Sequence, residues 1–402
     1  MVRGTISRMT IYLDHAATTP MRPEVLEAML PLLTGTFGNP SSPHAQGRRA
    51  RAALDEAHET LARAIGAEPR EIVFTASGTE ATNLAVKGAA WAGKASGNQI
   101  VTTAVEHHAT LHAVRHLEKF GFEAIVLPVD RYGRVDPEAV DATITDRTVL
   151  VTVMLANNEV GTIQPIAEIV ERVRRHRRVL IHVDAVQGAP YLDLDVRSLD
   201  IDLLSLGAHK LEGPKGMGVL YIRHGTTLLP QTHGGSQERH RRAGTENVAG
   251  AVGMARALEL CVAERPETVR RLRRLRDRLA QATLAVPGVE LTGHPKERLA
   301  GHLSVIARDA DGDAIALSLD LEGIACSTGS ACTTGSTEPS HVLSAMGYPE
   351  EEARGALRLT LGRTTTADEI EVAVRTVPPC IARMRAASAA VTADPLGLEV
   401  PA

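Results

Sequence analysis

Short apolar segments alternate with longer amphipathic ones through the first half of the chain, and this alternation strongly limits the possible folds. A strand, a helix and a second strand in succession form a βαβ unit, so the pattern predicts a mostly parallel sheet flanked by helices. The expected strands are Glu71–Thr75, Gln99–Thr103, Ala124–Val129, Val149–Leu155, Val179–Asp184, Asp202–Leu206 and Gly218–Ile222. The expected helices between them include Glu80–Trp91, Ala109–Phe120, Pro137–Thr143 and Ile166–His176.

The order of elements changes toward the second half of the chain. The turn signal Gly213-Pro214-Lys215-Gly216 joins the last two strands directly, so the sheet is expected to be mixed. A smaller α+β unit should follow, since we expect long helices at Glu246–Arg265 and Thr268–Ala285 and strands near Leu303–Ala307 and Ala356–Leu361. The second of these helices is rich in arginine, but leucines at helical spacing indicate that the arginines form a solvated face.

Composition excludes several classes of protein. The length of 402 residues predicts two or three domains, and the 44% hydrophobic share with few aromatic residues predicts a large, mainly aliphatic core. With 2% aromatic residues and a formal charge of −4, the chain offers no basic field and few stacking platforms for nucleic acid. We find neither a signal peptide nor an apolar stretch long enough to span a membrane, and the four cysteines form no CxxC pair. A reducing, cytoplasmic setting is therefore expected.

Lys210 is one of only six lysines, and it follows a buried apolar strand. A lysine at the carboxyl end of a strand points into the crevice where α/β sheets bind ligands. Desolvation lowers the pKa of such an amine, which can then act as a nucleophile or form a Schiff base. A surface lysine in a loop is the alternative.

Asp184 ends a second hydrophobic strand, where an unpaired carboxylate is costly to bury. A protonated pyridine nitrogen, as in pyridoxal phosphate, would compensate it, and a helix N-cap is the alternative. The segment Thr75-Ala76-Ser77-Gly78-Thr79-Glu80 joins a strand to a helix, where it could bind an anion, form a capping box, or do both. Glycine-rich dinucleotide and P-loop motifs are absent from the sequence.

Cys332 lies in a run of small polar residues that can scarcely anchor a core, and an exposed thiol on a mobile loop suits a reactive nucleophile. Cys326 is expected to be structural, with a Cys326–Cys332 redox pair as the alternative. His108, His112 and His116 share a helix face, for which a polar surface is preferred to a zinc site, and we predict no metal.

His107 differs from those three histidines. It is expected to end the strand that begins at Gln99, at the same sheet edge as Asp184 and Lys210. An imidazole there could stack on a ring or move protons.

In this order, the motifs resemble the cysteine desulfurases of the NifS/IscS type, within the class V aminotransferase group of pyridoxal-phosphate enzymes. The resemblance extends from about Ile11 to Ile381. It is carried by the segments 12–20, 37–42, 106–108, 157–161, 182–187, 208–210, 213–216, 242–247, 329–332 and 338–341.

The resemblance implies the pyridoxal-phosphate-dependent transferase fold of type I. This is an α/β fold with a mostly parallel seven-stranded sheet flanked by helices and a smaller α+β domain. The implied parts are an N-terminal segment 1–20 that joins the small domain, a large domain 21–262, a small domain 263–385 with the cysteine loop at about 326–340, and a loose tail 386–402.

The same resemblance implies conversion of L-cysteine to L-alanine, with the sulfur held on Cys332 as a persulfide. Lys210 would bind pyridoxal phosphate as a Schiff base and then remove the α-proton of the substrate. The other implied cofactor contacts are Asp184 with the ring nitrogen, Gln187 with the ring hydroxyl oxygen, His107 stacked on the ring, and Gly78, Thr79 and His209 with the phosphate. Thr245 would be donated to this site across a homodimer. Asn158 and Arg358 would bind the substrate carboxylate, and Asn158 would also lie next to the cofactor.

Two positions depart from the family pattern. Gly207 stands where a hydroxyl side chain usually contacts the phosphate, and Leu211-Glu212 replaces a site that is often aromatic or small. The sulfur acceptor, such as an iron–sulfur scaffold or a tRNA-thiolation protein, cannot be named from the sequence. The alternative functions are a selenocysteine lyase or another pyridoxal-phosphate-dependent carbon–sulfur lyase. A silent sulfur-carrier subunit would be expected to lack Lys210 or Cys332.

Overall fold

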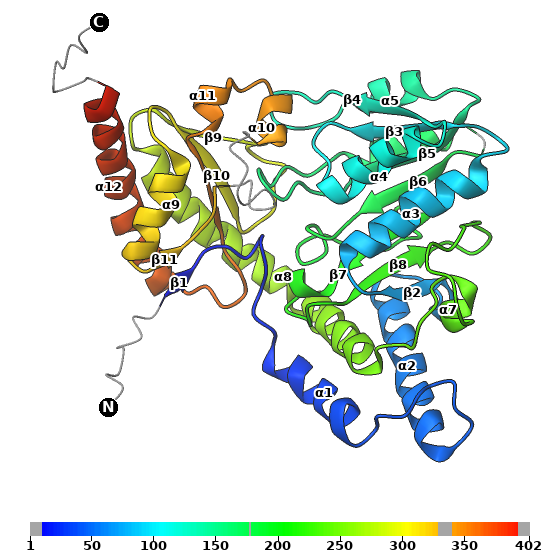
Figure 1. The fold of residues 1–402 in the computed structure, drawn as a ribbon. Coiled ribbons are helices and arrows are strands. Elements are labelled where there is room, and N and C mark those ends of the chain that lie inside the picture. The colour runs from blue at the N-terminus through cyan, green and yellow to red at the C-terminus, as the bar shows by residue number, and fades with distance from the viewer. Residues whose placement is uncertain (1–9, 177, 329–339, 393–402) are drawn as a thin grey trace, which may run out of the picture.

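The computed structural model describes residues 10–176, 178–328 and 340–392, and a seven-stranded sheet forms its centre (Figure 1). The strand order is β2-β8-β7-β6-β5-β3-β4, with β8 antiparallel to both neighbours and the other pairs parallel. The strands are β2 (Ile72–Thr75), β3 (Gln99–Thr103), β4 (Glu123–Leu127), β5 (Thr148–Met154), β6 (Leu180–Asp184), β7 (Leu203–Gly207) and β8 (Gly218–Ile222). The predicted mixed, mostly parallel sheet is therefore confirmed, with strand ends within two residues of those expected.

Helices cover both faces of this sheet. They are α1 (Pro23–Thr34), α2 (Ala45–Ala64), α3 (Gly78–Gly93), α4 (His108–Glu118), α5 (Pro137–Thr143), α6 (Ile166–Val173) and the short α7 (Gln237–His240), with 3₁₀ turns at Pro69–Glu71 and Ala208–Lys210. Side chains alternate between the two faces along each strand. Leu204 thus packs in the core that includes α1, α2 and α6, whereas its neighbour Leu203 packs in the core that includes α3 and α4.

One long helix, α8 (Val248–Leu284), connects the two parts of the molecule (Figure 1). The prediction of two helices was wrong, because the helix continues for 37 residues through Pro266. Packing holds both ends: Leu258 lies in the core beside the large sheet, and Leu279 lies in a second core. This packing offsets the backbone hydrogen bond that a proline removes. The expected domain boundary between residues 262 and 263 falls inside this helix.

The second core surrounds a three-stranded antiparallel sheet of order β12-β10-β9. The elements here are β9 (Val289–Leu291), β10 (His302–Ala307), β12 (Ala356–Thr360), α9 (Gly312–Leu321), α10 (His341–Ala345), α11 (Glu350–Ala353) and α12 (Ala367–Thr392). The N-terminal strand β1 (Ile11–Tyr12) pairs with β11 (Ile324–Ala325), which attaches the start of the described chain to this part. Arg276, expected on a solvated helix face, is buried and donates to the carbonyl of Leu299 at 3.2 Å.

The end of the chain corrects a further expectation. Residues 386–392 were expected to be loose, but they continue α12. Val377 and Ile381 anchor this helix in the second core, and the alanine-rich sequence that follows has a high helix propensity. None of the helices in the described ranges has the length and apolar character that a membrane crossing requires.

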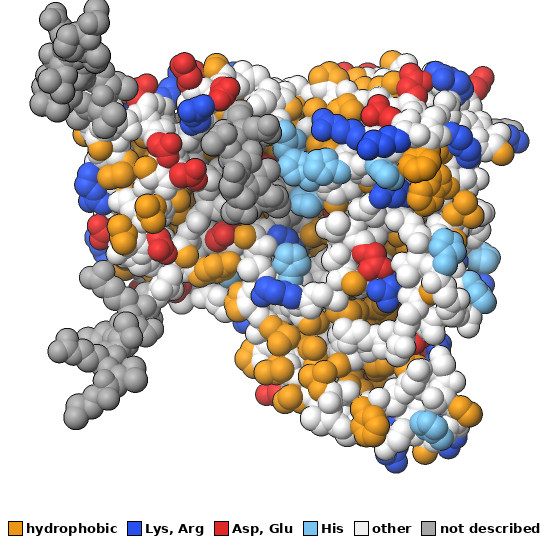
Figure 2. All heavy atoms as spheres, viewed as in Figure 1, with side chains coloured by type: hydrophobic (Ala, Val, Ile, Leu, Met, Phe, Trp, Pro, Cys, Tyr) orange, Lys and Arg blue, Asp and Glu red, His pale blue; other side chains and the backbone are white. Residues whose placement is uncertain are grey.

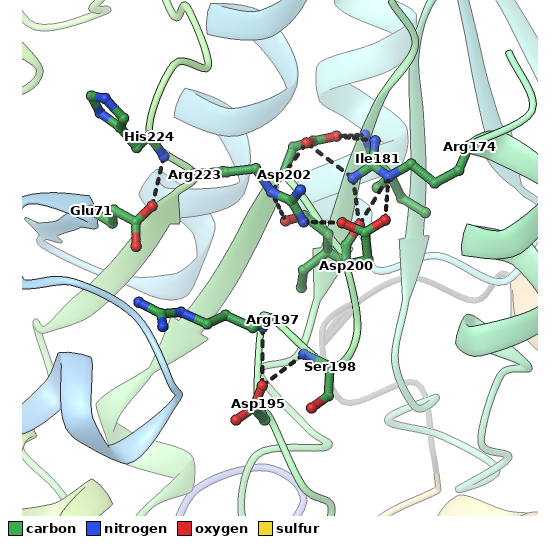
Figure 3. Close-up of polar contacts among 11 residues, drawn as sticks. Glu71, Arg174, Ile181, Asp195, Arg197, Ser198, Asp200, Asp202, Arg223 and His224 are labelled. Atoms are coloured by element: carbon green, nitrogen blue, oxygen red, sulfur yellow. Dashed lines mark hydrogen bonds and ion pairs between the residues drawn. The ribbon is translucent and has the colours of Figure 1, made fainter. Parts of the chain in front are cut away.

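Charged side chains tie β6, β7 and β8 together at the amino ends of β6 and β7 (Figure 3). Oδ2 of the buried Asp202 accepts hydrogen bonds from the N–H of Ile181 at 2.8 Å and from Arg174 at 3.0 Å. Arg223, which follows β8, donates to Asp200 at 2.6 Å. These bonds hold the strands together at their amino ends, on the side of the sheet away from the carboxyl ends.

Candidate active site

A cavity of about 260 Å³ lies at the carboxyl ends of the parallel strands. The sheet register places Met154 beside Asp184, and Asp184 beside Ser205. Nine of the eleven predicted site residues line the cavity: Gly78, Thr79, His107, Asn158, Asp184, Gln187, His209, Lys210 and Arg358. Of the other two, Thr245 is exposed and does not line it, and Cys332 lies outside the described residues.

Lys210 reaches the cavity from the 3₁₀ turn that follows β7. Its ammonium group donates hydrogen bonds to the carbonyl oxygens of Ala16 and of Ala17, the latter at 2.7 Å. The N-terminal segment therefore forms part of the wall around the amine. Beside it, Nδ1 of His209 lies 3.2 Å from Oγ1 of Thr18, and burial lowers the pKa of His209 to about 4.

Asp184 is a buried carboxylate at the end of β6. Its Oδ1 accepts the N–H of Val186 at 3.0 Å. Burial raises the pKa of Asp184 to about 6, while the N–H of Val186 and the charge of Lys210 act in the opposite direction. A protonated ring or another cation in the cavity would stabilise the charged carboxylate.

The N-terminus of α3 provides a site for an anion. Ser77 caps the helix by accepting the N–H of Glu80 at 3.0 Å, and the Glu80 carboxylate accepts the N–H of Ala76, the residue before the cap, at 2.7 Å. Gly78 and Thr79, in the first turn, line the cavity, where the helix dipole favours negative charge. A Cβ on Gly78 would lie 2.7 Å from Cγ2 of Val186, so this position requires glycine.

Gly207, like Gly78, lies against the side chain of Val186. A Cβ at this position would lie 3.3 Å from Cγ1 of Val186, which is tighter than ordinary van der Waals contact. A hydroxyl side chain here would therefore require Val186 to shift. The glycine at position 207 thus leaves room for the branched side chain of Val186.

His107 is the N-cap of α4 and does not end a strand, as β3 stops at Thr103. Its Nδ1 accepts the N–H of Ala109 at 3.1 Å, so in the neutral ring the proton is on Nε2. Burial lowers the pKa of His107 to about 4, with a smaller contribution from the neighbouring His108. The imidazole is therefore neutral near pH 7.

Arg358 approaches the cavity from β12, in the second sheet, and is 2% exposed. Its Nη2 lies 2.9 Å from Oδ1 of Asp14, and its Nη1 donates to the carbonyl of Asn158 at 2.9 Å. Asn157 holds the turn that carries Asn158, since its Oδ1 accepts the N–H groups of Glu159 and Val160 at 2.8 and 2.9 Å. The cavity thus combines groups from both sheets.

A family model of the aminotransferase class-V family matches residues 11–372. The chain belongs to this family. It is 48% identical over 375 residues to a cysteine desulfurase IscS of Methanosarcina thermophila, with 93% of each chain covered. Among solved structures, a NifS-like protein is similar with a TM-score of 0.88 and 35% identity, covering 93% of this chain and 100% of that one. The structure titled "SspA in complex with cysteine" has a TM-score of 0.78 and 34% identity, with 88% and 99% covered.

This class-V aminotransferase family member also contains contacts that the sequence did not reveal. Gln187 donates from Nε2 to the carbonyl of Ala16 at 2.7 Å, so residues 14–17 touch Gln187, Lys210 and Arg358. The motif at residues 12–20 supported the resemblance, but it gave no sign of these contacts. They depend on carbonyl groups and on residues far apart in the chain.

Histidine side chains gather near the cavity of this family member, and Figure 2 shows several on one face of the molecule. The rings of His108 and His112 stack at 4.9 Å, and those of His108 and His341 lie 4.6 Å apart. Across the described part of the chain, no three His, Cys, Asp or Glu side chains form a group that could hold a metal ion. Cys326 is half-buried, and burial raises its pKa to about 12, which disfavours a reactive thiolate.

Proposed function

We propose that this protein is a pyridoxal-phosphate-dependent cysteine desulfurase that converts L-cysteine to L-alanine and transfers the sulfur to its own Cys332. The observation that carries the proposal is that Lys210, Asp184 and Arg358 line the same cavity. The substrate is supported by the names of the similar proteins, a cysteine desulfurase and a structure in complex with cysteine.

The residues around the cavity fit pyridoxal phosphate. The amine of Lys210 matches its aldehyde, and the buried carboxylate of Asp184 matches its pyridine nitrogen. The N-terminus of α3, which has no side chain at Gly78, matches its phosphate. Class-V aminotransferases generally use this cofactor. The residues that would hold it are Gly78, Thr79, His107, Asn158, Asp184, Gln187, His209 and Lys210, with Thr245 from a second subunit.

When bound, pyridoxal phosphate supplies an electron sink for negative charge at the α-carbon of an amino acid. Arg358 and Asn158 would bind the substrate carboxylate and fix the orientation of the α-carbon. Nζ of Lys210 would accept the α-proton. Asp184 would keep a proton on the ring nitrogen, and the neutral His107 would offer its Nε2 proton next to the ring.

Cys332 would receive the sulfur. A sulfur–sulfur bond forms as the carbon–sulfur bond of the substrate breaks, and the β-carbon takes up a proton. One Cys332 thiol and one cysteine thus yield one persulfide and one alanine, so the transfer needs no external oxidant. We also propose that the enzyme is a cytoplasmic homodimer and that an acceptor protein, such as an iron–sulfur scaffold or a tRNA-thiolation protein, removes the sulfur.

The proposal is tested by incubating the purified protein with pyridoxal phosphate, L-cysteine and a thiol reductant, then measuring sulfide and alanine. We expect equal amounts of both. Cys332→Ala and Lys210→Ala should abolish both products, whereas the matched controls Cys326→Ala and Lys215→Ala should retain them. Sulfide formation by Cys332→Ala at the wild-type rate would instead support a lyase that does not require this cysteine.

A further inference from the structure

Glu212 stands two residues after Lys210, in a conformation that few residues other than glycine adopt. Its φ is +60°, and its side chain is buried. Its backbone N–H donates to Oγ1 of Thr19 at 2.9 Å, and its carbonyl accepts the N–H of Arg22 at 3.0 Å. Both of its backbone groups therefore hold the N-terminal segment against the turn of Lys210. A strained backbone of this kind persists where the surrounding contacts determine it, often near a functional site.

The Glu212 carboxylate connects this turn to the chain that follows β12 of the three-stranded sheet. Its Oε2 accepts a hydrogen bond from Nε of Arg363 at 2.6 Å. The same oxygen lies 3.8 Å from Nε of Arg22, whose guanidinium donates two hydrogen bonds to Glu264 on α8 at 3.0 and 2.7 Å. The ion pair between Glu212 and Arg363 is thus part of a network that joins the N-terminal segment, the lysine turn, α8 and the chain after β12.

These contacts connect the two ends of the proposed substrate site. Glu212 follows Lys210 by two residues, and Arg363 follows Arg358 by five. Lys210 would act at the α-carbon, and Arg358 would bind the carboxylate attached to it. A second contact supports the same junction: a Cβ on Gly362 would lie 2.2 Å from Nδ1 of His15, so the chain after β12 packs closely on the N-terminal segment.

We propose that Glu212 is a positioning residue whose ion pair with Arg363 fixes the distance between Lys210 and Arg358, and with it the fit of a small α-amino acid. The inference rests on the proposed function of those two residues. Glu212 itself does not line the cavity of the site. Its effect is transmitted through the turn and through the chain after β12, because their separation decides how tightly a small α-amino acid binds between Lys210 and Arg358.

Three variants separate the charge of Glu212 from its backbone. Glu212→Gln keeps the size and removes the charge, Arg363→Met removes the partner, and Glu212→Gly suits the positive φ but has no side chain. We expect each to raise the KM for cysteine about tenfold while kcat changes less than about threefold. The double variant Glu212→Gln with Arg363→Met should be no worse than either single variant.

Glu264→Gln is the matched control, because it weakens the same network without touching the Glu212–Arg363 pair. It should leave KM within about twofold of wild type. A wild-type KM in Glu212→Gly would show that the residue only forms the turn, and would overturn the inference. So would additive effects of Glu212→Gln and Arg363→Met.

A measurement without cofactor or substrate separates this inference from the proposed function. Hydrogen–deuterium exchange of the cofactor-free protein reports the amides of residues 211–213, which are bonded to Ala208 and Thr19. We expect exchange there about tenfold faster in Glu212→Gln and Arg363→Met than in wild type or Glu264→Gln. Unchanged exchange in Arg363→Met would overturn the inference even in an active enzyme. A wild-type protein that forms no alanine from cysteine would refute only the proposed function.

Discussion

Oδ1 of Asp14 lies 2.9 Å from Nη2 of Arg358, although the two residues are 344 positions apart in the chain. Arg358 is almost completely buried, and an unpaired buried charge is costly. Asp14 therefore compensates the guanidinium and fixes its direction. The proposed carboxylate-binding group is held by a residue that comes before the large sheet in sequence.

Asp14→Asn tests this relationship, because it keeps an acceptor oxygen but loses the charge. We expect the free energy of unfolding to fall by about 1–3 kcal/mol and the KM for cysteine to rise about three- to tenfold. Chemical denaturation and steady-state kinetics check the two effects. Glu350→Gln, which loses an exposed pair with Arg354, should change stability by less than about 0.5 kcal/mol. An equally small change in Asp14→Asn would contradict the argument.

Asp184→Asn should weaken cofactor binding and yet stabilise the cofactor-free protein at pH 7. The pKa of Asp184 is raised from 3.8 to about 6, chiefly by burial, so the folded state binds a proton more tightly than the unfolded state. The tighter binding of this proton stabilises the folded state fully below pH 3.8, and that stabilisation is lost as the pH rises through 6. The variant should be more stable than wild type by roughly 1–3 kcal/mol at pH 7 and equal to it near pH 3.5. Chemical denaturation gives the free energy of unfolding of both proteins at the two pH values. A stability gain of the variant that persists at the lower pH would refute the prediction.

Gly78→Ala should lose most of its affinity for pyridoxal phosphate, since the new Cβ would lie 2.7 Å from Cγ2 of Val186. The affinity should fall about tenfold or more, as measured by titration of the visible absorbance of the bound cofactor. Val186→Ala removes the clashing methyl groups, so the double variant should recover much of the loss. Failure of this rescue would show that Gly78 is needed for another reason.

Asp202→Asn should destabilise the protein without altering the active site. Asp202 accepts hydrogen bonds from Ile181 and Arg174 at the opposite edge of the sheet (Figure 3). Loss of the charge should cost about 1.5–3 kcal/mol of unfolding free energy, while the KM for cysteine stays unchanged. Thermal denaturation and kinetics of the same preparation test both parts. A changed KM would mean that the two edges of the sheet are coupled.

Periodicity was sufficient to predict the strands of the large sheet, because each buried strand is short, apolar and followed by a turn or a helix. It failed at Pro266, where packing at both ends keeps α8 continuous, and at residues 386–392, where alanine propensity extends α12. The cavity-lining side chains at strand ends could be named from motifs. The contacts of Asp14 and Glu212 could not, because they join segments whose proximity is a property of the assembled fold.

The N-terminal strand β1 pairs with β11, and Asp14 bonds to Arg358, so segments 11–17 and 324–358 meet beside one cavity. During synthesis on the ribosome, the strands of the large sheet and Lys210 emerge well before β11 and Arg358. The residues proposed to hold the cofactor are therefore translated before Arg358, which is proposed to bind the substrate carboxylate. In a nascent chain of this protein, the residues proposed to hold the cofactor are thus present before the arginine proposed to select an amino acid.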